Sequence, residues 1–447
     1  MSLTRHPPAS LRELTAFSIP LMLTSLSFFS MIFIDRLFLA AYDLSAMTAS
    51  VNASIVGVSF LAGLCLIGSI AEVFVGRSYG AKDYGAIGAP VWQMLWMALF
   101  SALFFIPFSM LGGVETIFGV GREQEAIYLK WMLLTGPVSF AYAPLAAFFI
   151  GRGNTKIIVR VAIATNILNV ILDYFLIFGV EGWISPLGIE GAAFATCMGT
   201  TFQSAVFFLY FMQKKHRIRF GTTNWKFNYP IFKECFLIGI PAGLSITIEL
   251  MGWSLFYEMM RQLGVNHMLL AGVFQSLLML FFFFPEGLNK AVTAIVSNYI
   301  GERQEQVIPK VMVSALSLIL IPTVIALLLS PLAVAGIRMG FFNGEASAID
   351  SLLLGGWISV ILYVCFEGIR ASYIALLTSY KDTRYILLSG VISVVVFIFV
   401  PFFLFLSYTE LSELNALLIG LLFPAGHAML LYFRSRTLLY KPAPLAN

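Results

Sequence analysis

Apolar residues occur along this chain in long, almost continuous runs that short polar stretches separate. A helix needs roughly 20 apolar residues to cross the hydrocarbon core of a bilayer, and these runs reach that length. Their continuity argues against a transmembrane β-barrel, in which apolar and polar residues alternate over ~10 positions. The pattern therefore predicts about twelve transmembrane helices, at Leu14–Leu39, Val51–Val75, Val91–Leu111, Ala126–Phe149, Ile157–Phe178, Gly191–Met212, Phe236–Leu263, Met268–Val296, Ile308–Ile337, Leu352–Leu377, Ile386–Ser407 and Ala416–Phe433.

The composition supports an integral membrane protein. Only 11% of the residues are charged and 59% are hydrophobic, whereas soluble globular domains carry about 25% charged residues. The segment Met1 to Ser10 is short, polar and free of a cleavage site, so a cleavable signal peptide is not expected. The net charge of +4 is too small and dispersed for nucleic-acid binding, and the expected surrounding is the lipid bilayer.

Lysine and arginine are unevenly divided among the connections between the predicted spans. Connections after even-numbered spans are rich in them, whereas the GVEGWISPLGIEG connection after the fifth span has none. Because cytoplasmic loops carry an excess of these residues, both termini are expected in the cytoplasm, with the chain in the plasma (inner) membrane. The basic residues of the even-numbered connections and the tail are Arg77, Lys82, Arg152, Lys156, Arg160, Lys214, Lys215, Arg217, Arg219, Lys226, Lys233, Arg303, Lys310, Lys381, Arg384, Arg434, Arg436 and Lys441.

The two halves of the chain resemble each other. The longest polar interruption, Lys214 to Lys233, leaves six spans on either side. GAKD at Gly80 recurs as GERQ at Gly301, and RGNT at Arg152 recurs as YKDT at Tyr380. Both halves start and end on the same side, which is a parallel repeat of the kind that secondary transporters often use. The sequence predicts an all-α membrane fold of two six-helix lobes, residues 1–222 and 223–447, related by a pseudo-two-fold axis along the membrane normal.

Acidic residues lie within several of these apolar runs, and four of them, each in a different run, are Asp35, Asp173, Glu249 and Glu367. A carboxylate at the centre of a membrane helix costs at least ~2.5 kcal/mol on insertion scales. Such residues usually face a protein interior or a water-filled cavity and handle an ion or a proton. Acids in several separate spans therefore indicate an ion-coupled membrane protein.

The first half offers a candidate cation site made of Asp35, Asn169, Asp173 and Thr196. Asn169 and Asp173 are four residues apart and share a helix face. Together the four residues supply carboxylate, amide and hydroxyl oxygens, which suit Na⁺ or a proton. The alternative is an interhelical hydrogen-bond network that only packs the bundle.

The second half offers Glu249 and Glu367 as further coupling residues. Arg370 follows Glu367 by three residues on the same helical face, so a salt bridge is the competing interpretation. Glu286 and Lys290 are four residues apart and are better explained as an internal ion pair.

Other chemistry finds little support in the sequence. The four cysteines, scattered through apolar runs, fit small apolar filler. The four histidines have no metal-ligand spacing, and no Gly-rich loop matches a phosphate cradle. We therefore expect neither an enzyme nor an organic cofactor, only Na⁺ or H⁺ as a coupling ion.

The order and spacing of several motifs resemble the multidrug and toxic compound extrusion (MATE) family, in its NorM-like and DinF-like branches. The resemblance covers nearly the whole chain. It rests on IPLMLTSLSFFSMIFIDRLFLA, GRSYGAKDYG, GRGNTK, NILNVILDYFLIFG, PLGIEGAAFATCMGT, IEL and CFEGIR followed by SYKD, with Gly264 and Pro285 at family-like spacing.

This resemblance implies two six-helix lobes around a V-shaped cavity, and export of organic, cationic and amphipathic drugs in exchange for Na⁺ or H⁺ by alternating access. The family's first-span acid falls on Asp35, and its N-lobe partners fall on Asn169, Asp173 and Thr196. Its seventh-span and tenth-span acids fall on Glu249 and Glu367. This chain departs from the family's pattern in three ways. A Glu stands at Glu367 where the family usually has Asp, and Arg370 stands nearby. Ala271 and Gly272 occupy positions where many NorM-like members have polar residues.

Three other functions remain open at this point. A lipid-linked oligosaccharide or lipid flippase of the same broad superfamily would be favoured by extra C-terminal spans and a strongly cationic cavity, and neither is evident in the sequence. A channel is disfavoured by the two-lobe repeat, and a membrane enzyme by the isolated histidines. A monomer is expected, whereas the substrate's identity and the choice between Na⁺ and H⁺ are left open.

Overall fold

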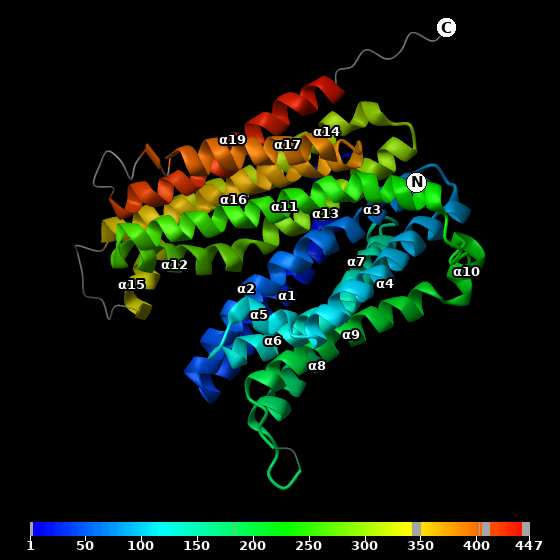
Figure 1. The fold of residues 1–447 in the computed structure, drawn as a ribbon. Helices are drawn as coiled ribbons and strands as arrows, with labels where there is room; N and C mark the ends of the chain where they lie inside the picture. Colours follow the sequence, from blue (N-terminus) through cyan, green and yellow to red (C-terminus); the bar gives the residue numbers. More distant parts are fainter. Residues whose placement is uncertain (1–2, 184, 342–349, 402, 405–411, 440–447) are drawn as a thin grey trace. The chain divides into compact units, whose positions relative to one another are not determined.

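The computed structural model describes residues 3–183, 185–341, 350–401, 403–404 and 412–439, and Figure 1 shows that its regular elements are helices. Within these residues, ten helices are long and apolar enough to cross a membrane, or eleven when one bent pair counts as a span. A shorter apolar helical stretch covers Thr383–Phe399. The expected fold of about twelve membrane helices is confirmed, although the end of the segment predicted at 386–407 lies outside the described residues.

Two compact units share the chain. The first unit contains Leu23–Thr247 and Ser297–Arg303, and the second contains the described residues of Ser2–Met22, Ile248–Val296 and Gln304–Asn447. Three helices therefore contribute to both units: α1 (Leu11–Tyr42), α11 (Tyr229–Leu263) and α13 (Phe283–Gly301). The division of the chain into lobes at residues 222 and 223 stays a prediction.

The first unit is built from helices that run between short turns. Helix α8 lies along α9, α4 packs on α7, and α2 packs on both α6 and α7. The elements are α1 (Leu11–Tyr42), α2 (Leu44–Ser69), α3 (Ala71–Gly80), η1 (Tyr84–Ala86), α4 (Gly88–Met110), α5 (Gly113–Phe118), α6 (Glu123–Leu134), α7 (Gly136–Ile150), α8 (Thr155–Phe178), α9 (Ile189–Phe211), α10 (Lys214–Phe220) and α11 (Tyr229–Leu263).

The second unit centres on one long helix, α16, which packs along α19 and also against α14 and α12. Its apolar core gathers aromatic and methionine side chains, among them Phe256, Met260 and Phe423. The remaining elements are α12 (Val265–Phe281), α13 (Phe283–Gly301), η2 (Glu305–Val307), α14 (Ile308–Leu328), α15 (Ser330–Phe341), α16 (Asp350–Ser379), α17 (Thr383–Val394), η3 (Val395–Phe399) and α19 (Glu413–Leu439).

Four of the predicted spans are interrupted once by a short break in the helix. The breaks fall at Ile70, Thr135, Phe282 and Leu329, and the pair α6 and α7 bends by 44°. Pro137, Pro285 and Pro331 follow three of these breaks, as expected for a residue that lacks a backbone donor. Pro20 and Pro241 instead lie inside the continuous helices α1 and α11.

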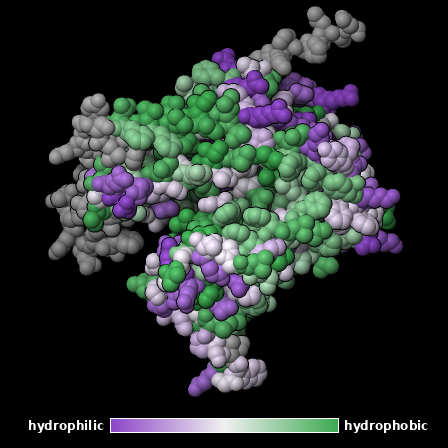
Figure 2. All heavy atoms as spheres, viewed as in Figure 1, coloured by the Kyte–Doolittle hydropathy of each residue, from purple (hydrophilic) through white to green (hydrophobic). Residues whose placement is uncertain are grey.

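Apolar side chains cover the outward faces of the helices. Figure 2 shows large hydrophobic areas along the helices, with hydrophilic residues gathered towards the ends. Leu103 of α4 is 78% exposed and Ile321 of α14 is 52% exposed. Exposed apolar surface of this extent suits contact with lipid, where every backbone polar group must be satisfied within the helix.

Helix α4 binds the segment that joins α10 to α11. The indole nitrogens of Trp92 and Trp96 each donate a 2.8 Å hydrogen bond, to the carbonyl oxygens of Thr222 and Trp225 respectively. The buried Gln93 accepts a 2.9 Å hydrogen bond from the Asn228 backbone N–H. These bonds replace the helical hydrogen bonds that an irregular segment lacks.

The repeated motifs adopt matching backbone conformations. Lys82 in GAKD and Arg303 in GERQ have φ angles of 61° and 60°, and a 3₁₀ turn follows each motif. Gly153 in RGNT and Lys381 in YKDT have φ angles of 78° and 64°. Non-glycine residues rarely adopt this left-handed region, so its recurrence at matching positions supports the internal repeat.

The repeat also appears in a contact between the C-terminal ends of α3 and α13, within the first unit. A Cβ placed on Gly80 would lie 2.1 Å from the carbonyl oxygen of Asn298, and a Cβ on Gly301 would lie 2.1 Å from that of Arg77. The two contacts are equivalent, because Asn298 precedes Gly301 by three positions and Arg77 precedes Gly80 by three positions. The two helices therefore cross at a pair of equivalent glycines.

We expect Gly80→Ala and Gly301→Ala each to lower the free energy of unfolding by about 1–3 kcal/mol, because an added methyl group forces the two backbones apart. The midpoint of thermal unfolding of the purified protein in detergent provides the measurement. Gly85→Ala is the matched control, since nothing lies within 4 Å of the position of its Cβ. Equal midpoints for all three variants would contradict the close crossing.

Candidate functional site

Close packing of α8 on α9 brings the polar residues of the first unit together. A Cβ on Gly191 would lie 2.6 Å from the carbonyl oxygen of Leu176, so only glycine permits this approach of the two backbones. Further along α9, a Cβ on Gly199 would lie 3.6 Å from the Cβ of Asn169. Small residues are the usual means by which membrane helices approach each other closely.

Asn169 links the two acids. The hydrogen-bond network is satisfied when its side-chain amide nitrogen faces them, 3.0 Å from Asp35 Oδ1 and 3.1 Å from Asp173 Oδ2. Thr196 Oγ1 donates a 3.1 Å hydrogen bond to Asp35 Oδ2. The structure therefore brings together all four residues of the predicted N-lobe site, from α1, α8 and α9. We call them the Asp35 cluster.

The Asp35 cluster is shielded from solvent. Asn169 and Asp173 are completely buried, and Asp35 is 5% exposed. One amide nitrogen, that of Asn169, lies within 3.1 Å of an oxygen of each carboxyl group, so the carboxyl groups of Asp35 and Asp173 are close to each other. Two bare carboxylates this close would repel strongly in a medium of low dielectric constant, so a proton or a cation between them is strongly stabilising.

Two neighbours of the Asp35 cluster were not predicted from the sequence. Asn166 Nδ2 donates to the carbonyl oxygen of Ser27 at 2.9 Å and lies 3.0 Å from its hydroxyl, which joins α8 to α1. Tyr128 of α6 is buried near Asp35 and Asp173. Asn166 could have been found, because Asn166, Asn169 and Asp173 occupy one helix face at spacings of three and four.

The second unit holds a different arrangement, which we call the Arg370 triad. The Arg370 guanidinium of α16 binds Glu249 of α11 at 2.8 and 3.0 Å. It also binds Glu367 of its own helix through Nε and Nη2, at 2.8 and 2.6 Å. Both carboxylates are thus held by two hydrogen bonds each, a geometry that the planar fork of arginine provides.

A histidine completes the surroundings of the triad. Arg370 Nη1 lies 3.4 Å from Nδ1 of the buried His427 in α19, and Nε2 of that ring lies 3.0 Å from Ser389 Oγ. Since the guanidinium can only donate, Nδ1 accepts and Nε2 carries the hydrogen, which makes this imidazole neutral. Sequence reasoning had treated His427 as isolated, because its partners come from other helices.

These contacts bear on the two interpretations of Glu249 and Glu367. The salt bridge that the position of Arg370 suggested is present, and it includes Glu249 as well. Two carboxylates and one guanidinium leave one negative charge uncompensated. The guanidinium occupies the oxygen atoms that an incoming cation would need, so a cation must displace it or bind beside it. Ala271 and Gly272 of α12 have no polar side-chain atom, so their side chains add no ligand.

Two other acids in predicted spans, Glu286 and Glu258, form ordinary ion pairs. Glu286 and Lys290 of α13 lie 2.8 Å apart, as expected from their spacing. Glu258 is bound by Arg261 at the exposed end of α11. Exposed pairs of this kind contribute little free energy.

Removal of Arg370 should be severely destabilising. Arg370→Gln leaves two carboxylates without a counter-charge, and breaking a buried pair in this way costs about 3–5 kcal/mol. Arg261→Gln, which breaks the exposed pair with Glu258, is the control and should cost under about 1 kcal/mol. Thermal unfolding in detergent compares the two. A similar, small shift for both would show that the triad does not stabilise the fold.

Comparisons with known proteins agree with this architecture. The MatE family profile matches residues 20–175, which include Asp35, Asn169 and Asp173. A probable multidrug resistance protein NorM of Photorhabdus laumondii is 24% identical over 389 residues, covering 84% of this chain and 83% of that protein. The multidrug export protein MepA of Staphylococcus aureus is 29% identical over 236 residues, covering 51% of either chain.

Solved structures share the fold over nearly the whole length. A MATE protein in the straight conformation superimposes with a TM-score of 0.80 at 16% identity, covering 96% of both chains. An outward-facing multidrug resistance MATE family transporter gives a TM-score of 0.79 at 16% identity, covering 98% of this chain and 97% of that one. Taken together, the profile match, the relatives and the shared fold support a multi-pass membrane protein that is similar to the NorM-like transporters of the MATE family.

Proposed function

We propose that this protein exports amphipathic organic cations in exchange for Na⁺ or H⁺, with the Asp35 cluster as the coupling site. The observation that carries the proposal is the pair of buried carboxyl groups bridged by Asn169. The names of the relatives, a multidrug resistance protein and a multidrug export protein, support drug-like substrates. The absence of a nucleotide-binding loop in the sequence favours an ion gradient as the energy source.

Exchange follows if the coupling ion and the substrate favour opposite conformations. A proton or Na⁺ at the Asp35 cluster neutralises one of two adjacent negative charges and stabilises the packing of α1, α8 and α9 in which they meet. A substrate that binds better when those helices are arranged differently then competes with the ion. Each ligand shifts the equilibrium only by its differential affinity, and the coupling is reciprocal.

The energetics are sufficient for accumulation. A tenfold gradient of the coupling ion is worth about 1.4 kcal/mol. One-for-one exchange of monovalent cations is electroneutral, so this gradient alone could sustain about a tenfold substrate gradient in the opposite direction. For one-for-one exchange, the substrate concentration ratio that can be sustained rises in proportion to the concentration ratio of the coupling ion.

Glu249 and Glu367 belong to the proposed coupling set with a secondary role. Arg370 already holds both, so a proton that binds there must first break an ion pair. In the Asp35 cluster, the hydrogen bonds to the two acids come from the neutral side chains of Asn169 and Thr196. We therefore assign the first binding step to the Asp35 cluster and a charge-balancing role to the Arg370 triad.

The cellular setting is part of the same proposal. The positive-inside pattern supports a plasma (inner) membrane location with both termini in the cytoplasm. We expect a monomer to suffice, because the Asp35 cluster and the Arg370 triad are each completed by residues of a single chain.

We expect Asp35→Asn to reduce gradient-driven efflux of a fluorescent organic cation from proteoliposomes by at least about tenfold, because the amide can neither bind a proton nor neutralise Na⁺. Parallel experiments with an imposed Na⁺ gradient and an imposed pH gradient identify the coupling ion. Glu258→Gln is the control, since that acid is exposed and paired at a helix end.

Each other outcome has a defined meaning. Full efflux by Asp35→Asn would show that the Asp35 cluster is not the coupling site. The coupling site would then be assigned to Glu249 and Glu367. A wild-type protein that moves no tested organic cation under either gradient would overturn the exporter proposal. It would favour the lipid-flippase alternative, which fluorescent lipid scrambling in the same vesicles can test.

A further inference from the structure

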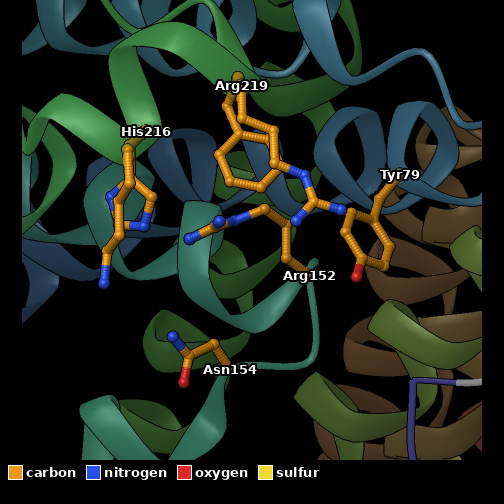
Figure 3. Close-up of a pocket in the computed structure, with 7 residues that line it drawn as sticks. Tyr79, Arg152, Asn154, His216 and Arg219 are labelled. Atoms are coloured by element: carbon orange, nitrogen blue, oxygen red, sulfur yellow. The ribbon is translucent and has the colours of Figure 1, made fainter.

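A second polar site lies outside the Asp35 cluster, where α3, α7 and α10 end in the first unit. The hollow has a volume of about 270 Å³ and is lined by Tyr79, Arg152, Asn154, Lys215, His216 and Arg219, among others. Figure 3 shows the side chains of Arg152, Arg219 and Tyr79 converging, with Asn154 below them and His216 to one side. We call this hollow the basic pocket.

Arg152 is positioned by aromatic rings rather than by an acid. Its guanidinium carbon lies 3.7 Å from the centre of the Phe148 ring and 4.3 Å from that of Phe220. Nε donates a 2.8 Å hydrogen bond to the Phe148 carbonyl oxygen. Nη2 is buried and has no hydrogen-bond partner among the described residues. A charged donor left in this condition is costly, and each such group requires an explanation.

The charges of the basic pocket are all of one sign. Arg219 lies over the Tyr84 ring at 4.9 Å, and Lys215 adds a third cation. None of the seven described residues that line the hollow is an aspartate or a glutamate. Burial, together with the charge of Arg219, lowers the pKa of Arg152 to about 9. Three cations without a lining carboxylate form a site that an anion would stabilise.

His216 does not add to this charge at neutral pH. Its Nδ1 lies 2.6 Å from the carbonyl oxygen of Tyr210 and therefore donates to it. Burial, followed by the charges of Arg152 and Lys215, lowers the pKa of His216 to about 4. The imidazole is thus neutral, and the exposed amide of Asn154 remains as a further polar group at the rim.

The size and the location of the pocket restrict the ligand. Pockets for drug-sized molecules have volumes of about 300–1,000 Å³, so this hollow suits a smaller group. It lies where two membrane-spanning helices meet the side predicted to be cytoplasmic. Basic pockets at this level bind the phosphate groups of anionic lipids, and arginine forks match phosphate geometry with two donors.

We propose that the basic pocket binds a phosphate group, through the guanidinium groups of Arg152 and Arg219 and the ammonium group of Lys215. The phosphate belongs either to an anionic lipid headgroup or to a soluble phosphate compound. A bound phosphate provides the missing acceptor for Arg152 Nη2 and links the ends of α3, α7 and α10. This site is separate from the Asp35 cluster and does not depend on the exporter proposal.

The test uses the full-length protein, purified in detergent and stripped of lipid, with binding measured by titration calorimetry at constant ionic strength. One set of titrations uses dioctanoyl phosphatidylglycerol against dioctanoyl phosphatidylcholine, and the other uses inorganic phosphate against chloride. We expect Arg219→Gln to lower the affinity for the bound anion roughly tenfold relative to wild type. This variant is chosen because Arg219 is exposed and should be replaceable without unfolding.

Lys214→Gln is the matched control, because it removes one positive charge from the same helix at an exposed residue outside the lining. It should change affinity by less than about twofold, since its charge acts only through solvent. Binding of phosphatidylglycerol alone identifies a lipid site, and binding of inorganic phosphate shows that a soluble phosphate suffices. If neither anion binds better than its reference, or if Lys214→Gln weakens binding as much as Arg219→Gln, the proposal is wrong.

Discussion

The cost of placing a charge away from water governs the polar interior of this protein. An isolated ion in a medium of low dielectric constant is so unfavourable that it must be paired, protonated or bound to a counter-ion. Each buried acid in a membrane helix therefore needs partners from other helices. The packing of α8 on α9, and the ion pair between Arg370 of α16 and Glu249 of α11, are in this sense conditions for retaining Asp173 and Glu249 inside the bundle.

The two units meet this requirement in different ways. In the Asp35 cluster, neutral donors from Asn169 and Thr196 surround two carboxyl groups, and no permanent cation takes part among the four residues. In the Arg370 triad, a fixed guanidinium engages both carboxylates. The first arrangement leaves the counter-charge to be supplied by a mobile ion, whereas the second supplies most of it internally. The two halves thus hold their buried acids in different ways, although matching turns of the backbone have similar conformations.

That similarity is clearest where the backbone has the fewest alternatives. The left-handed residues Lys82 and Arg303 occupy matching turns, and Gly80 and Gly301 form a reciprocal close contact. A second pair of contacts lies at matching positions of the two halves. Gly151, which precedes RGNT, packs against the Glu72 carbonyl oxygen, and Ser379, which precedes YKDT, donates to the carbonyl oxygen of Thr293. Side chains at such crossings are limited by space, so their positions in the two halves remain comparable even where few residues are identical.

The sequence by itself determined the helical membrane fold, because continuous apolar runs of this length leave the backbone only helical hydrogen bonding in lipid. It also identified Asp35, Asn169, Asp173 and Thr196 as candidates, since buried polar residues at helical spacing are rare in such runs. Only the tertiary structure decided which side chains meet. Arg370 binding both Glu249 and Glu367, the place of His427, and the basic pocket around Arg152 all depend on contacts between helices distant in sequence. Periodicity along one helix contains no information on which neighbour its polar face will find.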